Sequence, residues 1–167
     1  QSRAFNPELA GGGLLNVGIY PIHMGCYLYG EHPIEINSQA YMSTTGVDEQ
    51  GVAIFTYSGG KMLNAAFGIN CDAQHPLMIY GDAGYIEVKH PFYGAEKAIL
   101  HREDKDPIVF EEKLACNGFE YEAEAVMQCV QANNIECDII NHAESIAVAE
   151  TLDTIRAQWG LVYPMEK

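Results

Sequence analysis

Hydrophobic residues recur at helical spacing in the first part of the chain, directly after a glycine triplet at residues 11–13. The positions that would share one face of this helix are Leu15, Ile19, Ile22, Cys26 and Tyr29. This spacing predicts a helix over residues 14–30. Because proline lacks a backbone N–H, we expect Pro21 to lie near the first turn of the helix or to kink it.

From residue 33 to residue 113 the hydrophobic pattern changes to a period of two, which is typical of strands. The alternation is clearest over residues 61–71, where one face consists of Leu63, Ala65, Phe67, Ile69 and Cys71. Further strands are predicted over residues 35–44, 51–57, 76–80, 85–89, 98–102 and 108–112. Short connections such as 58–60 and 81–84 favour antiparallel pairing, because a parallel crossover needs roughly a dozen residues or more.

The last part of the chain returns to helical periodicity in two segments. Asn117 with Glu120, and Asn141 with Glu144, have the spacing of a capping box, which marks a helix start. The apolar stripe of the first helix would be Phe119, Ala123, Val126, Met127 and Val130. That of the second would be Val148, Leu152, Ile155 and Trp159, with Gly160 as the stop. Strands grouped between helices predict an α+β fold, an open and predominantly antiparallel sheet with helices packed on one face.

The second face of the strand over residues 61–71 carries small and amide side chains instead of long charged ones. These are Met62, Asn64, Ala66, Gly68 and Asn70. Such a face is compatible with plain solvation, and it is equally suited to packing against another protein surface. We expect a subunit or domain interface here.

The length of 167 residues corresponds to one domain, since domains contain roughly 100–200 residues. No repeat or linker interrupts the sequence, so a single domain is expected over residues 1–167. The formal net charge of −14 repels phosphate backbones and anionic lipids, which argues against nucleic acid and membrane partners. No apolar run approaches the roughly 20 residues of a spanning helix, and the amino end lacks a signal-peptide pattern. A cytoplasmic location is therefore expected.

The five cysteines are an odd number without C-x-x-C spacing, which argues against a disulfide framework and against a zinc site. We expect buried, reduced thiols that pack as small hydrophobic groups. The six histidines never occur at H-x-x-x-H spacing, so no metal is predicted.

The glycine triplet does not form a dinucleotide fingerprint. Its sixth position is Asn16, and the residues before it include Pro7 and have no strand pattern. Phosphate-loop, hydrolase-elbow and zinc-protease motifs do not occur either.

A cluster of three side chains remains as candidate chemistry. Asn16, Tyr20 and His23 are spaced i, i+4 and i+7, which would place an amide, a phenol and an imidazole on one face of the predicted helix. Tyr20 could donate or accept a proton if a nearby cation lowered its pKa from about 10. The alternative from the residues alone is a buried, hydrogen-bonded tyrosine.

Several strings of the sequence are characteristic. The main one is NPELAGGGLLNVGIYP over residues 6–21. Further strings are TGVDE over 45–49, IYGDAGYI over 79–86, GFEYEAE over 118–124 and QWGLVYP over 158–164. With these strings the sequence resembles the C-terminal domain of the glucose-fructose oxidoreductase, inositol dehydrogenase and MocA (Gfo/Idh/MocA) family, and in particular its dihydrodiol dehydrogenase-like branch. The resemblance covers almost the whole chain, and the order and spacing of the strings make it specific.

The resemblance implies a chain that forms one half of an enzyme. In this family an N-terminal Rossmann domain binds NAD or NADP, and the C-terminal domain contributes part of the substrate pocket and the oligomer interface. The chain would then be the substrate-binding and oligomerisation half of an oxidoreductase acting on a sugar, polyol or diol, inactive by itself and forming a homo-oligomer through its open sheet face. The alternative is a non-catalytic dimerising scaffold or binding module that keeps the fold.

The resemblance also implies roles for individual residues. The family motif D-x-G-x-H-x-x-D aligns Tyr20 with the histidine that acts in proton transfer beside a lysine of the other domain, and the dihydrodiol dehydrogenase branch uses a tyrosine there. Asn16 replaces the first aspartate and cannot bear its charge, so it would orient the substrate by hydrogen bonding, the alternative being a member with altered or weakened chemistry. His23 would line the pocket or pack as a structural histidine. Tyr93 and Phe119 would supply aromatic walls, the alternative for Phe119 being the packing of its helix on the core.

Overall fold

The structure is a computed structural model that describes residues 2–71, 74 and 76–167. Within it the chain divides into two compact units. The first comprises Gln1–Ala73 and Ile140–Lys167, and the second comprises Gln74–Ile139.

Each unit contains its own antiparallel sheet, so the strands form two hydrogen-bonded sheets where the sequence predicted one. Pro76 stands directly before the first strand of the second sheet, and it has no N–H with which to extend the hydrogen-bond ladder backwards. The α+β class with antiparallel strands is confirmed.

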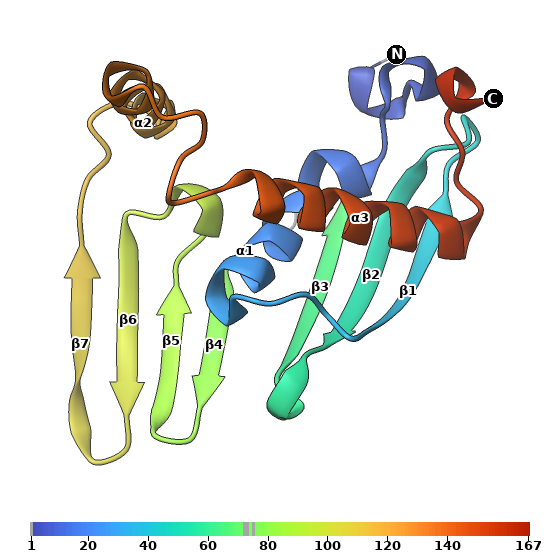
Figure 1. Cartoon of the computed structure of the whole chain (residues 1–167). Coiled ribbons are helices and arrows are strands. Elements are labelled where there is room, and N and C mark those ends of the chain that lie inside the picture. Colours follow the sequence, from blue (N-terminus) through green and yellow to red (C-terminus); the bar gives the residue numbers. More distant parts are fainter. Residues whose placement is uncertain (1, 72–73, 75) are drawn as a thin grey trace. The chain divides into compact units, whose positions relative to one another are not determined.

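The first unit is a three-stranded sheet with helices on one face. Its strands β1 (Glu35–Met42), β2 (Asp48–Thr56) and β3 (Met62–Gly68) pair in the order β1-β2-β3. Helices α1 (Ile19–Tyr29) and α3 (His142–Trp159) lie across this sheet and contact each other (Figure 1). The predicted packing of helices on one sheet face is therefore present in this unit.

Apolar side chains from both helices and from the inward positions of the strands form the core of the first unit. Its buried members are Leu14, Ile22, Cys26, Ala53, Phe55, Tyr57, Ala65, Phe67, Val148, Leu152 and Ile155. The predicted stripe of α3 is thus confirmed as a core-facing stripe. The helix ends at Gly160, whose φ of 68° is the left-handed conformation that glycine adopts readily.

The start of the first helix differs from the prediction. Leu14–Gly18 winds as a π-helix, in which Ile19 N donates to Leu14 O, and α1 begins only at Ile19. The wide turn packs closely on the sheet, since a Cβ at Gly18 would lie 3.0 Å from the Phe67 ring. Pro21 lies in the first turn of α1, as expected.

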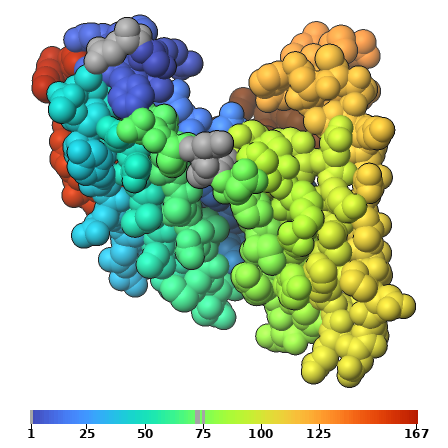
Figure 2. All heavy atoms as spheres, turned by 180° about the vertical axis from the view of Figure 1, so that it is seen from behind, coloured from blue at the N-terminus to red at the C-terminus, as the bar shows by residue number. Residues whose placement is uncertain are grey.

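The opposite face of the first sheet carries exposed side chains. Met62, Asn64 and Ala66 of β3 are exposed and alternate with buried Ala65 and Phe67, as the sequence predicted. Figure 2 views the molecule from behind, where the strands of the first unit form the surface with no helix over them.

The second unit is built on a four-stranded antiparallel meander (Figure 1). The strands follow the chain in the order β4 (Leu77–Gly81), β5 (Gly84–Val88), β6 (Lys97–Arg102) and β7 (Lys105–Glu111). Pro107 lies in β7, which is an edge strand and therefore tolerates a missing N–H.

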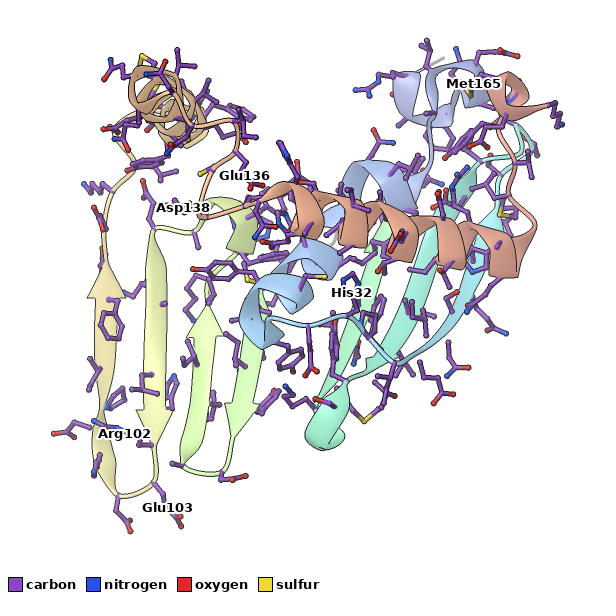
Figure 3. The ribbon with its side chains drawn as sticks, in the orientation of Figure 1. His32, Arg102, Glu103, Glu136, Asp138 and Met165 are labelled. Atoms are coloured by element: carbon purple, nitrogen blue, oxygen red, sulfur yellow. The ribbon has the colours of Figure 1, made fainter. Side chains whose placement is uncertain are left out.

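Helix α2 (Phe119–Ala132) of the second unit buries none of its residues. Its predicted apolar stripe is exposed, with Phe119, Val126, Met127 and Val130 each more than half accessible. Figure 3 labels Glu136 and Asp138 in the segment after this helix, and Arg102 and Glu103 at the turn between β6 and β7.

Among the described residues, no helix is long and apolar enough to cross a membrane. Within the same part of the chain, no group of three His, Cys, Asp or Glu side chains is arranged to hold a metal ion.

The five cysteines are not joined in disulfides, and only Cys26 is buried. Cys71 and Cys116 are exposed, and Cys129 and Cys137 are half-buried. The expectation of buried thiols is therefore wrong for four of the five, because these four lie outside the core of the first unit.

Candidate functional site

The candidate residues of the first unit lie at and after the helix start, by which we mean the glycine triplet and the π-helical turn (residues 11–18). The π-helical turn packs on β2 and β3, and Tyr20 follows it in the first turn of α1. Turns of this kind are rare and occur frequently at functional sites.

Three hydrogen bonds that involve side chains hold the backbone of the helix start, in addition to the backbone bonds from Gly11 N to Asn6 O and from Gly12 N to Ala4 O. Tyr163 Oη donates to Gly11 O at 2.6 Å, and burial raises the pKa of this tyrosine to about 12, which keeps the phenol protonated. Asn16 Nδ2 donates to Gly12 O at 2.6 Å. Leu14 N donates to Asp48 Oδ2 at 2.6 Å. The backbone that leads to Tyr20 is therefore fixed from the C-terminal segment, from β2 and from within the turn.

Close packing explains the glycine triplet. A Cβ at Gly11 would lie 2.6 Å from Ala4 O, and a Cβ at Gly12 would lie 2.1 Å from Asp48 Oδ1. Gly12 also has a φ of 113°, which side chains rarely allow. The triplet thus packs against a carboxylate, a neighbour that would repel a phosphate group.

Asp48 is a buried carboxylate that sequence reasoning did not single out. It has no exposed surface, and burial raises the pKa of its carboxyl group to about 6, although hydrogen bonds from the backbone N–H groups of Leu14 and Gly13 oppose the rise. Among the described residues its Oδ1 has no hydrogen-bond partner. The only sequence signal was its place in the string over residues 45–49 that carried the family resemblance.

Tyr20 is 44% exposed, so the burial assumed by the alternative of a buried, hydrogen-bonded tyrosine is wrong. Its backbone lies where the π-helical turn passes into α1, and its side chain is not part of the buried core. A phenol in this position can exchange a proton with a bound hydroxyl group.

Asn16 and His23 have partners within the first unit. The amide nitrogen of Asn16 is engaged by Gly12 O, so its side-chain oxygen is the atom suited to accept a hydrogen bond from a ligand. His23 Nε2 lies 3.0 Å from Glu144 Oε1, and both side chains are partly exposed.

Glu144, the partner of His23, is also the last residue of the predicted capping motif at the start of α3. Asn141 Oδ1 accepts from Glu144 N, as predicted, while the Glu144 carboxylate reaches across to α1 instead of closing the box on Asn141. Glu144 therefore ties the start of α3 to the helix that carries Tyr20. The capping spacing marked Glu144, but nothing in the sequence indicated its partner 121 residues away.

Tyr93 and Phe119 belong to the second unit. Tyr93 lies in a 3₁₀ turn, Phe92–Gly94, where its ring meets the Phe92 ring edge-on at 5.5 Å, and it is about half exposed. Phe119 begins α2 and is 67% exposed, so the alternative that it fixes its helix to a core is wrong. Both rings are available for contact with a ligand.

The GFO/IDH/MocA C-terminal domain model matches residues 1–87 of the chain, which include the whole helix start and the first sheet. The chain belongs to this family. Its sequence is 30% identical over 170 residues to the trans-1,2-dihydrobenzene-1,2-diol dehydrogenase of Danio rerio, covering 98% of the chain and 51% of the relative.

A second relative is the NADP(+)-dependent scyllo-inositol 2-dehydrogenase IolU of Bacillus subtilis, 27% identical over 98% of the chain and 49% of the relative. Among solved structures, an aldose-aldose oxidoreductase of Caulobacter crescentus in complex with glycerol superimposes with a TM-score of 0.79 at 19% identity, covering 96% of the chain and 50% of that protein. The family relationship and the fold expected from the resemblance are confirmed. The chain spans about half the length of the curated relatives it matches.

Proposed function

We propose that this chain is the substrate-binding and oligomerisation half of an NAD(P)-dependent oxidoreductase that interconverts a hydroxyl and a carbonyl group on a sugar, polyol or diol. The relatives named above are dehydrogenases of a diol and of an inositol, which supports this class of substrate. The observation that carries the proposal is the exposed Tyr20 phenol on a helix start held by three hydrogen bonds that involve side chains.

The chain's own residues do not fit the phosphates of NAD or NADP. The glycine triplet, the only segment with glycines in suitable number, lies against the Asp48 carboxylate and the Ala4 carbonyl. We therefore assign the cofactor mainly to a separate nucleotide-binding domain of the kind the family carries.

In the proposed reaction Tyr20 moves the proton of the substrate hydroxyl group. A positive charge beside the phenol, such as a lysine of the nucleotide-binding domain, would stabilise the negative charge that develops on its oxygen. Asn16 and His23 would orient the substrate next to Tyr20.

The direct test joins this chain to the nucleotide-binding domain of its parent protein and measures turnover of trans-1,2-dihydrobenzene-1,2-diol and scyllo-inositol with NAD⁺ and with NADP⁺. Turnover of either compound is expected. The chain alone should show no specific binding in a titration with NADH. Tight NADH binding by the chain alone, or a joined protein that oxidises neither these nor other diols, polyols and sugars, would contradict the proposal.

One observation favours the alternative of a non-catalytic scaffold. Asn16 stands where the family motif has an aspartate, and its amide donates to the backbone as an ionised aspartate could not. The residue is thus used to hold the helix start. The turnover assay separates the two proposals, because a scaffold would assemble without oxidising any of the substrates.

The proposed oligomer contact is the outer face of the first sheet. Tyr41, Val52, Ile54 and Met62 are large apolar side chains exposed on this face. In a chain with a net charge of −14, an exposed apolar patch of this kind is suited to a contact between identical copies.

Replacing Ile54 by Lys should therefore weaken self-association, because the dimer would have to bury an unpaired charge. Light scattering after size exclusion should show a shift toward the monomer. The same substitution at Val126 on the exposed helix of the second unit is the control and should leave the mass unchanged. If the Ile54→Lys variant had the same mass in solution as the parent, the contact between copies would lie elsewhere.

A further inference from the structure

A β-bulge in the first sheet turns Asp48 toward the helix start. Tyr41 pairs with Gln50 and Met42 pairs with Asp48, so Glu49 is an extra residue in β2. Side chains alternate along a regular strand, which would place Asp48 on the same outer face as Gln50. With the bulge, Asp48 is buried on the inner side together with Gly51.

The inward turn brings the carboxylate to the first N–H of the helical segment. Leu14 N donates to Asp48 Oδ2 at 2.6 Å, across 34 residues of sequence. The first N–H groups of a helix have no partner within it, and a negative charge is favourable at this end. Asp48 thus acts as a cap that β2 supplies to the helix carrying Tyr20.

The surroundings of Asp48 leave the helix start little freedom to move. Gly12 and Gly13 pass so close that a Cβ on either would lie 2.1 Å and 3.3 Å from the carboxylate oxygens. Asn16 then closes the turn on Gly12 O. A shift of the carboxylate would therefore move the backbone at both ends of the π-helical turn.

Stability alone is a poor explanation for a carboxylate at this place. Its Oδ1 lacks a partner among the described residues, and the side chain has no exposed surface. A buried, incompletely bonded charge is unfavourable, and departures of this kind are typical of sites where function constrains the structure.

We propose that Asp48 is a positioning residue for Tyr20, holding the helix start at the distance from β2 that places the phenol against the substrate. The proposal rests on the proposed role of Tyr20 in proton transfer. Asp48 acts through the backbone of residues 12–18 and does not itself touch the substrate.

The first test measures hydrogen exchange in the chain itself and needs no substrate. In Asp48→Ala, peptides covering residues 11–20 should exchange at least about tenfold faster relative to peptides of α3, as expected for the loss of a charge-assisted hydrogen bond. The control is Val148→Ala, a core substitution in α3. The exchange rates of the two variants are compared under conditions in which their overall free energies of unfolding are equal. Asp48→Asn keeps an acceptor oxygen and should restore most of the protection.

Equal acceleration of residues 11–20 in Asp48→Ala and in Val148→Ala would overturn the proposal, because Asp48 would then stabilise the unit without fixing the helix start.

The second test measures turnover in the protein joined to its nucleotide-binding domain, well below the unfolding temperature. Asp48→Ala should lower kcat by about tenfold or more with a smaller change in KM, since small displacements of a catalytic group slow a reaction strongly. Val148→Ala should change kcat less than twofold. Equal kcat values in the two variants would overturn the positioning role.

If the joined parent protein turns over no substrate, the proposed function fails by itself. The exchange experiment then still decides whether Asp48 fixes the helix start, so the two failures are distinguishable.

Discussion

Helices α2 and α3 have similar apolar stripes in the sequence but different environments in the structure. The α3 stripe is buried, with Val148, Leu152 and Ile155 in the core of the first unit. The α2 stripe is exposed, and the helix has no buried residue. Helical periodicity therefore predicts that a face is apolar, but it does not predict whether the same unit supplies the surface that covers it.

The largest expected difference between the two helices is in stability. Leu152→Ala removes a buried side chain and should lower the free energy of unfolding by about 2–5 kcal/mol. Val126→Ala on the exposed stripe should change it by less than about 0.5 kcal/mol. Urea unfolding followed by circular dichroism measures both. A cost above about 1 kcal/mol for Val126→Ala would mean that the α2 stripe is packed in the chain by itself.

The second difference is the pH dependence that Asp48 gives to the stability of the first unit. Asp48 has a pKa of about 6 in the folded protein, against 3.8 for an unperturbed aspartate. Its stabilising contribution is fully present below pH 3.8 and is lost as the pH rises through 6, because the folded state binds the proton more tightly. Between pH 4 and pH 7 the parent should lose about 2 kcal/mol of stability relative to Asp48→Asn.

If the free energy of unfolding changed with pH by the same amount in the parent and in Asp48→Asn, the pKa of Asp48 would not differ between the folded and unfolded states. The comparison isolates this group, because the other carboxylates are present in both proteins.

The smallest expected effect concerns the contact between α1 and α3. Glu144→Ala removes the partner of His23 and should cost about 0.5–1 kcal/mol, less at high salt, because the pair is partly exposed. Glu144→Gln keeps an acceptor and should cost less. Glu124→Ala on α2 is the matched control, with a change below about 0.5 kcal/mol. Equal values for Glu144→Ala and Glu124→Ala would mean that the His23 contact contributes no stability.

Local pattern was sufficient for most of the secondary structure. Period-two alternation located strands β1 to β7 to within a few residues. The largest errors were at the end of β3 and at the starts of β2 and β7, where polar residues such as Asp48 and Lys105 hide the strand. The burial of the Asp48 carboxylate and the pairing of β7 at the sheet edge depend on tertiary structure, which strand propensity does not describe.

The candidate site was less predictable. Spacing placed Asn16, Tyr20 and His23 on one helix, but it assumed α-helical winding where the chain forms a π-helical turn. The partners Asp48 and Glu144 come from 34 and 121 residues away, and no short-range pattern reports contacts of that separation. The sequence indicated the candidate groups for the chemistry, while the groups that hold them in place became apparent only in three dimensions.

The central claim is that the Tyr20 phenol transfers the substrate proton. The most direct measurement compares kcat of Tyr20→Phe with that of Tyr27→Phe, a change of an exposed tyrosine on the same helix, in the protein joined to its nucleotide-binding domain. Loss of a general acid-base group should lower kcat by about 10²-fold or more in Tyr20→Phe and leave Tyr27→Phe within about twofold of the parent. Near-normal turnover by Tyr20→Phe would contradict the account.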